Sequence, residues 1–212
     1  MEGYEHEKEQ VEAIKKWWEE NGKAIIVGAV IGITALVGWQ SWTNYQRSIS
    51  EAASAEYDQL TKAVEAGNSS AVEEHGSFIV NKYGKTPYAD LAKLELAKSK
   101  YASGDAAAAQ TYLQQVIDNA RLPELGYIAR LRLARILFAD GKPDKALSQL
   151  NVTVADAFTA AFEELKGDIY AAQNERELAR TAYTKALAQR EPGSPQDTLQ
   201  MKLDNLGDGD SR

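Results

Sequence analysis

The sequence predicts an all-α fold in which one N-terminal transmembrane helix is followed by a solenoid of helical pairs. Three observations carry this prediction. Residues 24–42 contain no charged side chain, apolar residues recur at every third or fourth position of the remaining chain, and similar stretches repeat at spacings of 37 and 33 residues. No convincing alternating strand pattern is present, and all five prolines lie beyond position 86.

The first element is the transmembrane helix, predicted over residues 23–42 and built on the run AIIVGAVIGITALVGWQSW. At roughly 1.5 Å per residue this run is about 28 Å long, close to the thickness of the bilayer core. All four tryptophans lie at its two ends, where indole rings favour the membrane interface. A buried core helix passes the same length test, but it has no reason to carry aromatic residues at both ends.

Positive charges next to the span predict its orientation. Four lysines precede the uncharged run of residues 24–42, whereas only Arg47 lies in the fifteen residues that follow. Lys and Arg close to a span tend to stay in the cytoplasm, so we expect a cytoplasmic N-terminus and an exported C-terminal part. A cleaved signal peptide is the alternative, but the head, residues 1–22, is long and rich in glutamate, unlike a short basic leader.

The N-terminal region has two further features, a glycine pattern in the span and an amphipathic segment in the head, and the sequence allows more than one role for each. Gly28 and Gly32 form a small-xxx-small pattern that allows another helix to approach closely, although glycine is common in transmembrane helices. Residues 9–20 have apolar side chains at helical spacing, which predicts an amphipathic helix. That helix could lie along the interface, simply extend the span, or make a regulatory contact in the cytoplasm.

The exported part shows internal repetition. In three stretches a small residue is followed seven positions later by a turn residue, and five positions after that by an alanine. The small residues are Ala97, Ala134 and Gly167, and the turn residues are Gly104, Gly141 and Asn174. This period matches the tetratricopeptide repeat, which is about 34 residues of two antiparallel helices with small residues where they cross. A glycine at the turn supplies the left-handed conformation that ends a helix.

The repeats divide the chain into successive elements. A degenerate pair, residues 50–66 and 70–82, precedes three units, residues 88–120, 127–154 and 160–189. A closing helix over residues 195–206 is expected because the last repeat needs a cover for its apolar face. The repeat domain therefore occupies residues 43–206, and we expect residues 207–212 to be a disordered tail.

In such a solenoid the first helix of each pair lines a concave surface. Apolar and aromatic groups with a few charges suit binding of an extended or helical peptide. The alternative for the leucines and aromatic residues is that they pack inside. By repeat position, the predicted partner-binding residues are Leu94, Lys98, Tyr101, Leu131, Arg135, Phe138, Glu164 and Asp168.

Composition and motifs exclude several functions. A net charge of −7 argues against a nucleic-acid partner. The chain has no cysteine, and its two histidines, His6 and His75, fall on opposite sides of the predicted membrane. No nucleophile elbow, zinc-protease motif, phosphate-binding loop or dinucleotide fingerprint is present. We therefore expect a protein without enzymatic activity, cofactor or bound metal.

The head block EKEQVEAIKKWWEENGK, residues 7–23, followed directly by a Gly-rich span and a Trp pair, resembles the start of the YfgM-like family. The resemblance continues through the repeats to MKLDNL, residues 201–206, and covers essentially the whole chain. It implies a bacterial inner-membrane protein, an ancillary subunit of the SecYEG translocon, with a cytoplasmic N-terminus and a periplasmic repeat domain. It also implies association with PpiD, a membrane-anchored periplasmic chaperone, and assistance to newly exported polypeptides.

Three hypotheses follow from the residues and the resemblance together. The leading one is a non-catalytic subunit of the secretion machinery whose repeat domain binds a partner chaperone, emerging polypeptides, or both. The second is a membrane-anchored scaffold for another envelope complex. The third is a tether that holds a cytoplasmic stress-response regulator through the N-terminal head.

Overall fold

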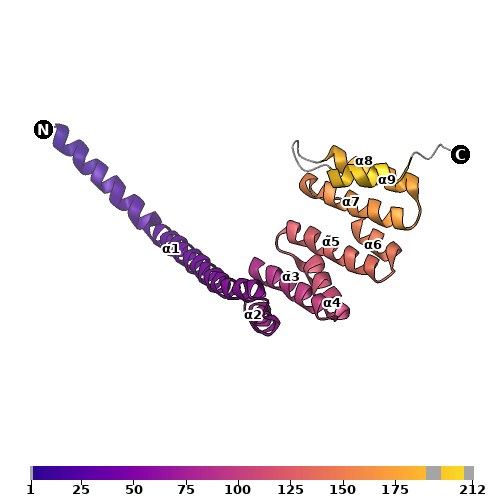
Figure 1. The fold of residues 1–212 in the computed structure, drawn as a ribbon. Helices are drawn as coiled ribbons and strands as arrows, with labels where there is room; N and C mark the ends of the chain where they lie inside the picture. The colour runs from indigo at the N-terminus through magenta and orange to yellow at the C-terminus, as the bar shows by residue number, and fades with distance from the viewer. Residues whose placement is uncertain (1, 190–196, 208–212) are drawn as a thin grey trace. The chain divides into compact units, whose positions relative to one another are not determined.

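The computed structural model describes residues 2–189 and 197–207, and its regular secondary structure in that part of the chain is all helical (Figure 1). Two compact units are distinguished, Met1–Glu51 and Ala52–Arg212. The helices are α1 (Glu2–Glu65), α2 (Ser69–Lys82), α3 (Pro87–Ala102), α4 (Ala106–Asn119), α5 (Pro123–Ala139), α6 (Pro143–Leu150), α7 (Asp156–Ala172), α8 (Arg176–Ala188) and α9 (Asp197–Asn205).

The first unit holds the predicted span within α1. One segment of this helix is long and apolar enough to cross a membrane, with a mean hydropathy of 1.8 over its best window, only 6% of which is buried. Its large apolar side chains, such as Ile31 and Leu36, are exposed by more than half of their surface. Exposing such apolar side chains to water costs free energy, so they favour an apolar surrounding such as the interior of a membrane.

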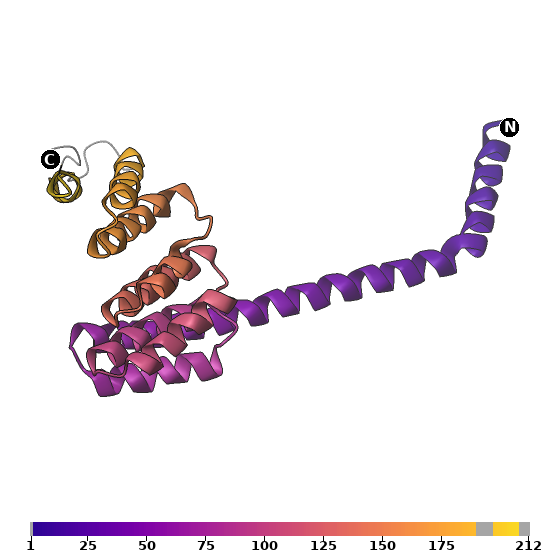
Figure 2. The same ribbon diagram turned by 90° about the vertical axis from the view of Figure 1, so that its right-hand side faces the viewer.

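The second unit is the repeat domain, in which each helix packs against the next along the chain (Figures 1 and 2). The end of α1 pairs with α2 through a shared apolar cluster, and α3–α4, α5–α6 and α7–α8 form the three predicted units. The first helices of neighbouring pairs also touch, α3 against α5 and α5 against α7. This is the all-α repeat architecture that the sequence predicts.

The turns inside the four pairs share one backbone motif. Gly67, Gly104, Gly141 and Asn174 all have positive φ, between 63° and 87°. In each turn the next N–H donates to a carbonyl five residues back, at 2.9–3.0 Å, which satisfies an orphan carbonyl at the end of the first helix. The turn at Gly67 lies 37 residues before Gly104, so the degenerate pair keeps the turn of the repeat although its other positions differ.

Small residues lie where the helices of a pair cross. Ala97, Ala109, Ala134, Ala146 and Ala179 are 0–2% exposed. At the third crossing a Cβ added to Gly167 would lie 2.3 Å from Cε1 of Tyr183. The degenerate pair instead buries Leu60 and Val72 at the equivalent positions.

The closing helix α9 covers the apolar face of the last pair. Leu199 is fully buried in a cluster with Ala179, Tyr183 and Ala186, and Leu203 packs against it. Residues 195 and 196 of the predicted closing helix lie outside the described residues. So does the predicted tail, except Gly207.

Candidate functional site

Six of the eight residues assigned by sequence to the concave surface fall into three groups, and the other two, Glu164 and Asp168, lie at the closing helix. Leu94 and Leu131 are only 3% and 7% exposed and belong to the main core cluster, so they pack inside the domain. Phe138 is half-buried against the same cluster. Lys98, Tyr101 and Arg135 are exposed, and Tyr101 shows 43% of its surface.

The three exposed residues line one groove, which we name the α3–α5 groove. Its volume is about 380 Å³, and its lining is Ala97, Lys98, Tyr101, Leu113, Arg132, Arg135 and Ile136. The buried Ala97, Leu113 and Ile136 supply apolar surface, while the charged ends come from α3 and α5. Tyr101 adds a ring that is apolar on its faces and polar at its hydroxyl.

Sequence reasoning missed Arg132, Leu113 and Ile136. Arg132 lies three positions before Arg135, so helical spacing alone places the two on neighbouring turns of one face. In the structure Nη1 of Arg132 donates to the carbonyl oxygen of Leu94 at 3.0 Å, which fixes the guanidinium next to α3. Leu113 comes from the second helix of its pair, whereas repeat position places only the first helices on the concave surface.

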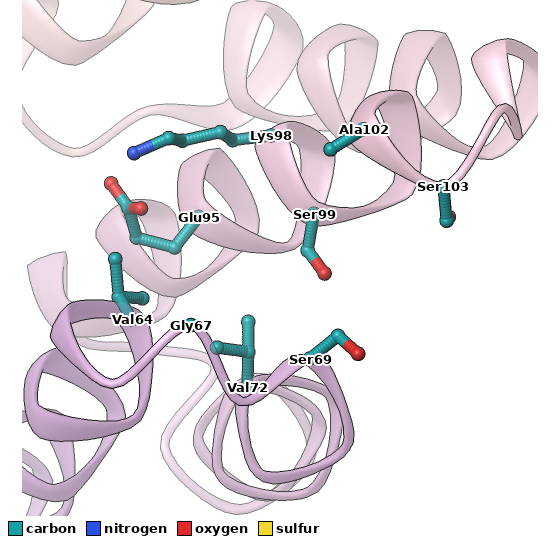
Figure 3. A pocket seen from close by; sticks show the side chains of 9 residues that line it. All are labelled: Val64, Gly67, Ser69, Val72, Glu95, Lys98, Ser99, Ala102 and Ser103. Atoms are coloured by element: carbon teal, nitrogen blue, oxygen red, sulfur yellow. The ribbon is translucent and has the colours of Figure 1, made fainter.

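A second groove, the α2–α3 groove, lies beside the first and has a volume of about 350 Å³. Figure 3 shows Val64 and Val72 pointing toward α3, with Glu95 and Lys98 reaching out from α3 itself. Lys98 lines both grooves, so the two are neighbours along the stack of helices. The remaining lining residues are small or polar: Gly67, Ser69, Ser99, Ala102 and Ser103.

Glu164 and Asp168, the predicted surface residues of the last pair, face the closing helix. Nζ of Lys202 in α9 lies 2.9 Å from Oε1 of Glu164 and 2.8 Å from Oδ1 of Asp168. The hydroxyl of Tyr183 donates to the same carboxylate of Asp168 at 2.8 Å. These acidic groups therefore fasten α9 to α7 and α8.

The pKa values of this network predict that the attachment of α9 weakens at alkaline pH. Burial lowers the pKa of Lys202, but its hydrogen bonds to Asp168 and Glu164 outweigh burial, so the net pKa is raised. Burial and then the hydrogen bond to Asp168 raise the pKa of Tyr183. Because both pKa values rise on folding, the stabilisation is complete below the ordinary values, about 10, and is lost as the pH rises through the raised values.

Thermal unfolding followed by circular dichroism between about pH 8 and pH 11 measures this loss. Tyr183→Phe removes one of the two titrating groups, so its melting temperature should fall less steeply with pH than that of the wild type. Tyr101→Phe, at an exposed position on α3, should follow the wild-type slope. An equally steep fall in Tyr183→Phe would contradict the prediction.

The glycines of the span have open surroundings in the structure. A Cβ added to Gly28 or Gly32 would meet no atom within 4 Å. The described residues therefore leave this helix face free for close approach of another helix, and such a contact stays a prediction. In the described part of the chain, no group of three or more His, Cys, Asp or Glu side chains could hold a metal ion.

Comparison with known proteins gives a consistent result along the chain. The family model for the tetratricopeptide repeat-like domain matches residues 15–208. The chain is 31% identical to the "Ancillary SecYEG translocon subunit" of Escherichia coli (strain K12), over 97% of its own length and 99% of that protein. It is 34% identical to the protein of the same name from Haemophilus influenzae, over 94% and 97% of the two chains, and 35% identical, with the same coverage, to that from Aggregatibacter actinomycetemcomitans.

Proposed function

Because this chain belongs to the tetratricopeptide repeat-like family that includes the ancillary SecYEG translocon subunits, we propose that it is a non-catalytic, membrane-anchored subunit of the Sec translocon. The resemblance seen in the head block points to the same family. The apolar segment of α1 together with translocon-associated relatives fits an inner-membrane protein. The bias of lysines toward the N-terminal side of the span supports a cytoplasmic head and a periplasmic repeat domain.

In this proposal the span keeps the repeat domain next to the translocon, and the domain binds a protein partner. The observation that carries the binding role is the α3–α5 groove, where the exposed ring of Tyr101 stands beside charged ends and apolar surface. Aromatic side chains at such places contribute much of the binding free energy in protein interfaces. A PpiD-type periplasmic chaperone and emerging exported polypeptides are the proposed partners, with membrane lipid around the span.

Affinity purification of the full-length protein from membranes in mild detergent, followed by mass spectrometry, tests the proposal. We expect the translocon core and a periplasm-facing chaperone to be recovered with the wild type. Tyr101→Ala should lower recovery of the chaperone about tenfold or more, because truncating an interface anchor typically costs about 2 kcal/mol. Leu178→Ala, at another exposed apolar side chain on α8, is the matched control and should change nothing.

Other outcomes of this purification would overturn the proposal. Recovery of a different envelope complex, with no translocon above background, would favour the scaffold hypothesis. If deletion of residues 1–20 instead releases a cytoplasmic regulator that otherwise copurifies, the head acts as a tether. Unchanged chaperone recovery with a correctly folded Tyr101→Ala variant would remove the α3–α5 groove from the binding role.

A further inference from the structure

The α3–α5 groove concentrates positive charge on an acidic protein. Lys98, Arg132 and Arg135 all line it, whereas the whole chain carries a net charge of −7. Within the part of the chain that the structure describes, none of these three side chains forms an ion pair within 4.0 Å of a carboxylate. Other lysines of the domain do have such partners: Lys93, Lys100, Lys142, Lys166 and Lys202.

The side chains of Lys98, Arg132 and Arg135 keep hydrogen-bond donors available for a ligand. Arg132 uses Nη1 to hold the carbonyl of Leu94, but a guanidinium has five N–H donors, so others remain. Arg135 and Lys98 are exposed, and Arg135 follows Arg132 by less than one helical turn. Two arginines with a nearby lysine provide the donors that a carboxylate group accepts.

The groove also has apolar surface, which restricts what can occupy it. Ala97, Leu113 and Ile136 are buried side chains that form its apolar lining, and the Tyr101 ring stands beside them. A ligand that uses the whole groove must therefore combine a carboxylate with an apolar or aromatic group. Because Lys98 also lines the α2–α3 groove, a longer ligand can continue from one groove into the next, which suits an extended polypeptide better than a single lipid headgroup.

We propose that the α3–α5 groove binds an extended acidic segment of a partner protein, one in which Asp or Glu side chains alternate with apolar or aromatic residues. This inference rests on the proposed function and names the kind of sequence that its binding surface takes. The carboxylates lie against Arg132, Arg135 and Lys98, and the apolar side chains contact Tyr101 and the apolar lining. The positive groove also attracts acidic segments at a distance, which speeds their association at low salt.

The test uses the full-length protein in an uncharged detergent and short fluorescent peptides blocked at both ends. One peptide alternates Phe with Glu, and the matched peptide carries Gln in place of each Glu. Fluorescence anisotropy should give a Kd about tenfold lower for the Glu peptide, with a difference that shrinks as salt is raised. Arg135→Gln and Lys98→Gln should each weaken binding of the Glu peptide several-fold and leave binding of the Gln peptide nearly unchanged.

Lys100→Gln is the control that the structure supplies. Lys100 lies on the same helix two residues from Lys98, but its Nζ pairs with Glu73 at 2.7 Å and it does not line the groove. Like Lys98→Gln, this substitution removes one positive charge from α3, but the charge lies outside the groove. It should therefore leave the Kd for the Glu peptide unchanged. Circular dichroism spectra identical to the wild type establish that each variant is folded.

Three results would overturn the inference. The first is equal affinity for the Glu and Gln peptides, and the second is an equal loss of affinity in Lys100→Gln, which would indicate unspecific attraction. The third is complete displacement of the Glu peptide by phosphatidylglycerol vesicles but not by phosphatidylcholine vesicles, which would make the groove a lipid site. If the protein purifies with the translocon but binds the Glu and Gln peptides equally, this inference is wrong and the proposed function still holds. If it distinguishes the two peptides but does not purify with the translocon, only the proposed function is wrong.

Discussion

Replacing Gly167 with alanine is expected to destabilise the repeat domain by about 2–3 kcal/mol. The new Cβ would lie 2.3 Å from Cε1 and 2.4 Å from Cδ1 of Tyr183, so α7 and α8 would have to separate or the ring would have to move. The ring is 3% exposed, and its hydroxyl donates to Asp168, so moving it breaks a hydrogen bond beside the Lys202 network. This cost exceeds the gain of about 1 kcal/mol that alanine brings to a helix.

Urea unfolding followed by far-ultraviolet circular dichroism measures this change. Tryptophan fluorescence is unsuitable because all four tryptophans lie between residues 17 and 42, outside the repeat domain. Gly126→Ala in α5 is the matched control, since its added Cβ would meet only the Cβ of Ala120, at 3.9 Å. That variant should be as stable as the wild type or more stable by about 0.5–1 kcal/mol.

The cause of the destabilisation can be isolated with a second substitution. Tyr183→Leu removes the ring that the added Cβ would strike, so the double variant should lose less stability than the two single variants added together. The expected coupling is about 1–3 kcal/mol. If Gly167→Ala unfolds at the wild-type urea concentration, the contact between Gly167 and Tyr183 does not set the crossing of α7 and α8.

Placing aspartate at both Val30 and Ile33 should abolish stable insertion into the membrane. An aspartate near the centre of a spanning helix costs about 2.5–3.5 kcal/mol on insertion scales, so two of them cost about 5–7 kcal/mol. The eight Ile, Val and Leu residues between positions 25 and 37 contribute only about 0.3–0.6 kcal/mol each. The penalty therefore exceeds the whole favourable contribution of these side chains.

Alkaline carbonate extraction of membranes separates inserted from peripheral protein and so measures this effect. The wild type should stay in the membrane pellet, and the double aspartate variant should be extracted or degraded. Leucine at both positions changes the same side chains while keeping them apolar, and this control should remain in the pellet. A double aspartate variant that resists extraction as well as the leucine control would show that this segment is not the membrane anchor.

The sequence by itself determined the class of the fold and the positions of its turns. An uncharged apolar run of this length indicates a spanning helix, a buried helix or a signal sequence. The flanking tryptophans argued against a buried helix, and the long glutamate-rich head argued against a signal sequence. The turn positions Gly104, Gly141 and Asn174 followed from spacing, because a left-handed residue and small crossing residues are local demands of a helical hairpin. Repeat position also placed Lys98, Tyr101 and Arg135 on one surface, and in the structure they line one groove; their role in binding a peptide stays a prediction.

Only the tertiary structure decided which side chains of each first helix face outward. Repeat position assigned Leu94 and Leu131 to the same surface as the exposed Lys98 and Arg135. The two leucines are nevertheless buried, because α3 and α5 pack against other helices there. Glu164 and Asp168 hold α9 through Lys202, a residue more than thirty positions away that no local pattern connects to them. Spacing fixes the face of a helix on which a side chain lies, whereas burial and charge pairing depend on which distant element covers that face.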